Sequence, residues 1–128
     1  MSRFPAPRAK TEARNDWARD LRDRLPDWLD EIAPQNARGM LAGNGAVNLV
    51  VGADKVAAFL PTSTGLSVYL FGSSDTEVMR IERLCERAGI PEDARPPRSS
   101  KYVLVKVRND EALATTAEAV RLHCIGRK

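Results

Sequence analysis

The feature that most constrains the fold is a series of three short apolar runs in the middle of the chain. They occupy residues 47–51, 56–60 and 66–71, and only turn residues separate them. Connections this short make neighbouring strands antiparallel. The glycine-rich residues 39–45 favour a strand with an Asn-Gly turn, because a phosphate-binding loop would lead into a helix. The sequence therefore predicts a β-meander.

A helical pattern precedes these strands. From about Thr11 onward apolar residues recur every four positions, at Ala13, Trp17, Leu21 and Leu25. Pro26 then breaks this helix, or restarts it as a short second helix that runs through Ile32.

The second half of the chain predicts a helix, a strand and a last helix. Ser74 and Glu77 have the spacing of a capping box, and the helix that they open ends at Gly89. Residues 102–107 are apolar at nearly every position, which is typical of a strand covered on both faces in the interior of a sheet. Asn109 then opens the last helix.

These elements follow in the order α-β-β-β-α-β-α. This order predicts an α+β fold with two layers, in which an antiparallel sheet of four to five strands carries its helices on one face. A chain of 128 residues, 43% of them hydrophobic, is long enough to bury a single core. We expect one such domain over residues 11–128. Residues 1–10 contain two prolines and little to bury beyond Phe4, which predicts a flexible basic N-terminal arm.

The net charge of +3 comes entirely from that arm. The chain has 20 basic and 17 acidic residues, and Arg3, Arg8 and Lys10 lie in a segment without any acidic residue. The rest of the chain therefore carries 17 of each sign. Nucleic-acid binding depends on clustered positive charge, so it would have to rest on the arm or on a patch formed in space.

The reactive side chains form no recognisable catalytic or metal-binding set. His123 is the one histidine, and although Cys124 follows it, adjacent residues on a helix point about 100° apart. An imidazole near a helix end that interacts with the terminal carbonyls is the plainer interpretation. Cys85 and Cys124 lie in apolar helical patterns without the spacing of a zinc site. We therefore expect buried thiols, no cofactor, no metal and no enzyme activity.

The same cysteine pattern, with no signal peptide before it, predicts a cytoplasmic protein. No apolar stretch approaches the length of a membrane-spanning helix, and no predicted helix combines a basic face with a strongly apolar one. We expect no membrane partner.

Nine basic residues are the candidate binding positions. They are Arg3, Arg8 and Lys10 of the arm, Arg80, Arg83 and Arg87 at helical spacing, and Arg95, Arg98 and Lys101 in and after a proline-containing loop. If these groups share a face, they would neutralise several phosphates, with the arm reaching into a groove. The chain has seven aromatic residues, and we assign most of them to the core, which argues against a base-stacking platform.

From Lys55 onward the chain resembles a family of small bacterial α+β domains. The stretches that carry the resemblance are KVAAFLPTSTGLSVYLF, a helix that ends ERAGIP, and SSKYVLVKVRNDEALATTAEAVRLH. They are similar to domains of the YjbR and TfoX N-terminal type. The resemblance implies a compact, usually non-catalytic module, sometimes likened to DNA-binding winged sheets and sometimes an accessory to other proteins. It transfers no catalytic residue, and the long charged N-terminal helix departs from the family's shorter one.

Two functional hypotheses follow. The first is a non-catalytic interaction module, a regulatory, inhibitory or accessory protein, that binds a protein through an exposed sheet edge or through the arginine stripe and its adjoining loop. The alternative is a DNA-binding accessory protein that uses the basic arm and the stripe. Trp17 and Trp28 lie on one helical stripe, which offers a surface for a homodimer.

Overall fold

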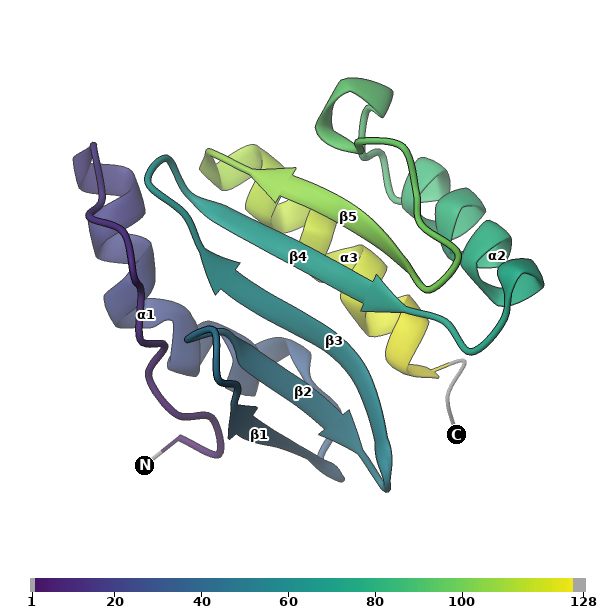
Figure 1. Ribbon diagram of the computed structural model, residues 1–128, viewed down its shortest axis with the longest axis horizontal. Helices are drawn as coiled ribbons and strands as arrows, with labels where there is room; N and C mark the ends of the chain where they lie inside the picture. The colour runs from purple at the N-terminus through teal and green to yellow at the C-terminus, as the bar shows by residue number, and fades with distance from the viewer. Residues whose placement is uncertain (1, 126–128) are drawn as a thin grey trace.

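The predicted meander forms the centre of the fold (Figure 1). The structure, a computed structural model, describes residues 2–125. Its sheet contains five antiparallel strands, which lie side by side in the order in which they follow along the chain. They are β1 (Ala37–Leu41), β2 (Val47–Val51), β3 (Asp54–Pro61), β4 (Leu66–Phe71) and β5 (Tyr102–Val107).

Helices cover one face of this sheet (Figure 1). They are α1 (Asp16–Ile32), α2 (Asp75–Arg87) and α3 (Asp110–Ile125), and a short 3-10 helix, η1 (Glu92–Ala94), lies in the loop between α2 and β5. The order of elements is α-β-β-β-β-α-β-α. The predicted two-layer α+β class is therefore confirmed, and β1 is one strand more than the predicted order contains.

Side-chain caps set where the helices begin. Ser74 and Asn109 cap α2 and α3 as predicted, because their side-chain oxygens accept hydrogen bonds from amides three residues later. Asn15 caps α1 in the same way. This helix therefore begins at Asp16, and not near Thr11 as the apolar spacing indicates.

The helix break expected at Pro26 is absent, and α1 continues through this residue to Ile32. An internal proline costs a helix about 3 kcal/mol. Leu25 and Leu29, on either side of it, are fully buried, and their burial together contributes about 3–6 kcal/mol. Packing against the sheet therefore outweighs the local preference of the proline.

β5 is an edge strand, so the prediction that residues 102–107 lie in the interior of the sheet is wrong. Among the described strands it pairs with β4 alone. Val103 and Val105 are buried toward the helices, whereas Leu104 and Lys106 alternate with them and face the other side. The sequence of this strand looks covered on both faces because Leu104 is apolar, although its side chain lies on the face away from the helices.

Residues 2–10, predicted as a flexible basic arm, lie extended beside α1 and β1 (Figure 1). Phe4 is 3% exposed and belongs to the hydrophobic core. It packs over Gly39 of β1, where a Cβ atom would come within 2.5 Å of the Phe4 ring. The Arg8 amide donates a hydrogen bond to the Gly45 carbonyl at 2.9 Å. At Phe4, the segment is therefore part of the core.

Candidate functional site

The two edges of the sheet differ in how they are covered. The N-terminal segment lies along β1, where Arg3 Nη1 donates to the Ala37 carbonyl at 3.2 Å and Phe4 packs over Gly39. At the other end of the sheet, no described strand pairs with the outer side of β5. An open strand edge is a template for pairing with another chain, and natural proteins usually protect such edges.

The hydrogen bonds between β4 and β5 show which backbone groups of β5 point outward. The Gly72 amide donates to the Lys101 carbonyl at 2.8 Å, just before β5 begins. In an antiparallel pair only alternate residues bond to the neighbouring strand. Val103 and Val105 therefore bond toward β4, and the backbone amides and carbonyls of Leu104 and Lys106 point toward the open edge.

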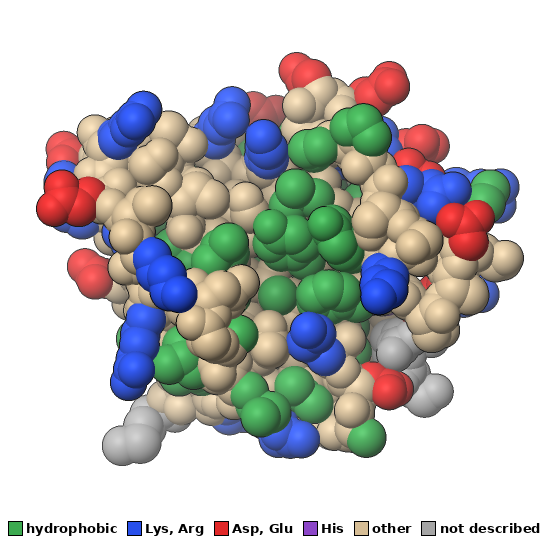
Figure 2. Space-filling model, in the orientation of Figure 1, with side chains coloured by type: hydrophobic (Ala, Val, Ile, Leu, Met, Phe, Trp, Pro, Cys, Tyr) green, Lys and Arg blue, Asp and Glu red, His purple; other side chains and the backbone are tan. Residues whose placement is uncertain are grey.

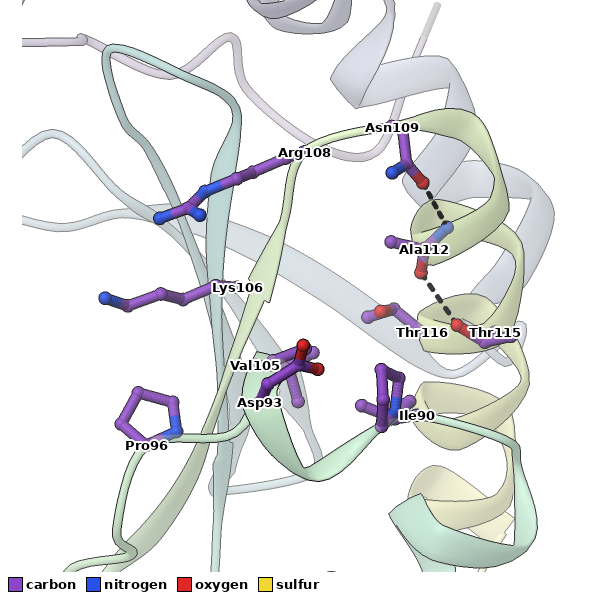
Figure 3. Close-up of a pocket in the computed structure, with 12 residues that line it drawn as sticks. Ile90, Asp93, Pro96, Val105, Lys106, Arg108, Asn109, Ala112, Thr115 and Thr116 are labelled. Carbon is purple, nitrogen blue, oxygen red and sulfur yellow. Dashed lines mark hydrogen bonds between the residues drawn. The ribbon is translucent and has the colours of Figure 1, made fainter.

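This edge opens into a cleft of about 400 Å³ between β5, the loop that contains η1, and α3 (Figure 3). Its volume lies within the usual range of ligand-binding pockets. Apolar side chains from three parts of the chain line it: Val105 from β5, Ala112 from α3, and Ile90 from the connection after α2. The polar residues at the cleft are Asp93, Lys106, Arg108, Asn109, Thr115 and Thr116.

Thr116 supplies a polar group within this cleft. The residue is fully buried, and its Oγ1 has no hydrogen-bond partner among the described residues. A helical threonine usually bonds to the carbonyl four residues earlier, but the Ala112 carbonyl already accepts a hydrogen bond from Thr115 Oγ1 at 3.0 Å. Figure 3 shows Thr116 extending from α3 toward β5. Its hydroxyl is therefore a buried polar group without a partner among the described residues, in the wall of the cleft.

Positive charge dominates the β5 side of the cleft. Lys106 and Arg108 are exposed and extend from the strand away from α3 (Figure 3). Asp93 of η1 is the acidic residue that lines the cleft. A ligand at this edge therefore meets apolar side chains on the helix side and two cations on the other side.

Ion pairs hold the outer wall of the cleft against α2. Arg98 contacts Asp75 at 2.6 Å and Glu82 at 2.8 Å, and the hydrogen bond that Arg98 donates to Asp75 is the main reason that the pKa of Arg98 is raised. Arg95 lies 4.0 Å from Glu86, and its side chain is only 10% exposed. These two arginines, predicted as binding residues, are therefore engaged within the protein.

The other predicted binding residues are distributed over two sides of the molecule. Arg3 is bonded to Asp30 and to backbone carbonyls. Those with exposed side chains are Arg8, Lys10, Arg80, Arg83, Arg87 and Lys101. The arm lies beside β1, whereas α2 lies at the β5 side of the sheet (Figure 1). The structure does not bring the arm and the arginine stripe together, and their role in binding stays a prediction.

The histidine and the cysteines are packed in the interior. His123 is 5% exposed, and its Nε2 lies 2.9 Å from the Phe71 carbonyl of β4. This hydrogen bond joins α3 to the sheet. Burial raises the pKa of the Cys85 and Cys124 thiols to about 11. No group of three or more metal-binding side chains occurs within residues 2–125.

The tryptophan stripe of α1 faces the protein's own core. Trp28 packs edge-on against Phe59, with ring centroids 5.9 Å apart. Trp17 is partly buried, and its Nε1 donates to Asp110 of α3 at 2.8 Å. The stripe that we considered for a homodimer is thus used within one chain, and the dimer itself stays a prediction.

None of the described helices has the length and apolar content to cross a membrane.

Sequence reasoning missed the cleft residues. Thr116 lies three residues after Leu113 and four before Val120, so a polar residue within the inward face of the last helix was a signal available in the sequence. The apolar run at residues 102–107 predicts an interior strand, and this prediction hides the open edge beside Lys106 and Arg108. No protein-family model, curated protein or solved structure matches this chain, so the YjbR-type resemblance stays a prediction.

Proposed function

We propose that this protein is a non-catalytic interaction module that binds an extended segment of a partner protein at the free edge of β5. The observation that carries the proposal is that this edge opens into a cleft of about 400 Å³, while the N-terminal segment lies along the β1 edge. An extended peptide that adds a strand to a sheet gains affinity from main-chain hydrogen bonds. Leu104 and Lys106 supply the amides and carbonyls for such bonds.

The surroundings of the edge favour a segment of alternating character. Successive side chains of an added strand point to opposite faces of the sheet. Those on the helix side would meet Ile90 and Ala112, which suit small apolar residues. Those on the other side would meet Lys106 and Arg108, which suit Asp or Glu. The proposed ligand is therefore an acidic segment with an apolar residue at every second position.

A labelled peptide of repeated Val-Glu pairs tests this proposal by fluorescence anisotropy. The decisive variant is Leu104→Pro, because it removes an amide that points away from β4, and proline is tolerated on strand edges in that orientation. Leu104→Ala is the matched control, because it shortens the side chain and keeps the amide. We expect Leu104→Pro to weaken binding at least about tenfold. Leu104→Ala should leave it within about twofold.

A charge reversal gives a second measurement, independent of whether the proline variant folds. Lys106→Glu should weaken binding of the same peptide, whereas Arg83→Glu on α2 should leave it unchanged, although both replace an exposed base. A peptide of the same composition, with its valines and glutamates in separate blocks, should bind more weakly. Equal binding by wild type and Lys106→Glu, or by both peptides, would show that the β5 edge is not the binding surface.

The DNA-binding alternative has less support from the contacts. Arg3 is committed to Asp30 and to the carbonyls of Pro34 and Ala37, and the arm lies far across the sheet from the stripe on α2 (Figure 1). Binding to random duplex DNA at rising salt, with and without residues 1–10, measures its contribution. A steep salt slope that flattens on deletion would favour this alternative over the peptide edge.

A further inference from the structure

The sheet face turned away from the helices has an apolar centre and a basic surround. Figure 2 shows hydrophobic side chains gathered in the middle of this face, with Lys and Arg side chains around them. Residues directly opposite each other on paired strands face the same side. The register therefore places Tyr69 beside Leu104, and Phe71 beside Tyr102, on this open face.

Three aromatic rings form the centre of the face. Tyr102 lies edge-on to Tyr69, with ring centroids 5.1 Å apart, and edge-on to Phe71 at 6.1 Å. The rings of Tyr69 and Phe71 are nearly parallel at 12°. All three are partly exposed. The sequence-based argument against a stacking platform assigned most aromatic residues to the core, and these three lie outside it.

A hollow of about 360 Å³ lies between these rings and the turn that joins β1 to β2. Asn48 and Ala58 line it from the neighbouring strands. Lys55 Nζ lies 4.6 Å above the Phe71 ring, at the border of the hollow. A planar ring with a nearby anionic group would therefore meet aromatic faces, a side-chain amide and a cation within one site.

The charged strand residues on this face are all basic. Arg38 and Lys55 both lie opposite Val50, and Lys106 lies opposite Ser67. Val50 and Ser67 alternate with core residues of their strands, so the three bases lie on the open side. Asp54 is the one acidic residue within the strands, and it pairs with Val51 of the helix-facing side. This face therefore attracts anions, which a purely apolar sheet face would not do.

We propose that the open face binds a segment of single-stranded nucleic acid, with bases stacked on Tyr69 and Phe71 and phosphates near Lys55 and Lys106. Aromatic side chains on an open sheet with cations around them are the combination that single strands require. An acidic peptide would use the cations and leave the ring faces without a planar partner. The hollow beside Asn48 accommodates one base, whose edge the amide can hydrogen-bond.

Fluorescein-labelled oligothymidylate, measured by anisotropy with the full chain, tests the stacking. Tyr69→Leu and Phe71→Leu keep apolar bulk and remove the ring, so each should weaken binding at least about fivefold. Trp17→Leu is the aromatic control on the helix side of the sheet, and it should bind as wild type does. Thermal melting confirms that each variant is folded.

Salt dependence tests the charges at the same face. Lys55→Gln should weaken binding and lower the slope of log affinity against log salt by about one, whereas Arg83→Gln on α2 should leave the slope unchanged. Lys55 is exposed, so this variant keeps the fold even where a ring variant does not. The inference is overturned by oligothymidylate binding that Lys55→Gln does not alter, by equal affinity for a duplex, or by polyglutamate binding that depends on the rings. Phe71→Leu should not change binding of the Val-Glu peptide, which separates this inference from the proposed peptide site.

Discussion

Thr116 is the residue that departs most clearly from its surroundings. It lies on the buried face of α3 among apolar side chains, and its hydroxyl makes no hydrogen bond to another described residue. A buried polar group without a partner costs about 1–3 kcal/mol. The Thr116 hydroxyl therefore lowers the stability of the folded protein.

Replacing Thr116 by valine exchanges the hydroxyl for a methyl group of similar shape. We expect Thr116→Val to raise the free energy of unfolding by about 1 kcal/mol, because it removes the desolvation cost. Urea unfolding measures this change. Thr115→Val is the control, because its hydroxyl donates to the Ala112 carbonyl and its loss should not stabilise the protein. A Thr116→Val protein less stable than wild type would mean that the hydroxyl is satisfied in the folded state.

At the scale of elements, β1 and the N-terminal segment depend on each other. Gly39 gives Phe4 access to the core, since a Cβ atom there would lie 2.5 Å from the Phe4 ring and 2.9 Å from its Cα. The backbone contact cannot be relieved by a side-chain rotation. The position of the segment along the β1 edge therefore depends on the absence of a side chain at residue 39.

Gly39→Ala should displace Phe4 and expose the segment. We expect the free energy of unfolding to fall by about 2–3 kcal/mol, the contribution of one buried phenylalanine. Trypsin should also cleave after Arg3 and Arg8 faster than in wild type. Gly43→Ala is the matched control, because nothing lies within 4 Å of a Cβ atom there. Equal stability and equal cleavage of both variants would mean that the segment does not depend on this contact.

At the scale of the whole molecule, the two layers are joined through a core that excludes water from several polar groups. Cys85 and Cys124 are buried in this core on α2 and α3, and desolvation raises their pKa from 9.0 to about 11. Below pH 9 both thiols are protonated in the folded and the unfolded chain. Above it the unfolded chain loses these protons first, so the folded state becomes less stable as the pH rises.

The free energy of unfolding should therefore fall between about pH 9 and 11, by up to about 2–3 kcal/mol for each thiol. Urea unfolding at several pH values measures the slope. The Cys85→Ala/Cys124→Ala double variant should be less stable at neutral pH because it leaves cavities. Its slope over this range should nevertheless be shallower than that of wild type. The same slope in both proteins would assign the loss to other groups.

Local chemistry explains what the sequence predicted well. The caps at Ser74 and Asn109, the antiparallel meander and the two-layer α+β class all depend on residues close to one another in the chain. Pro26 and β5 were predicted less well, because burial of Leu25 and Leu29 and the position of a strand in the sheet depend on distant parts of the chain.

The candidate sites belong almost entirely to tertiary structure. Among the described strands β5 pairs with β4 alone, which leaves an open edge, and η1 and α3 line the cleft beside it. Covering one face of the sheet leaves Tyr69, Phe71 and Tyr102 together on the other. Amino-acid order alone determined the strands of the meander and the helix starts at Ser74 and Asn109, since those preferences act over a few residues. Which edge and which face stay open was decided only by long-range packing, because the distances between such groups exist only in the folded chain.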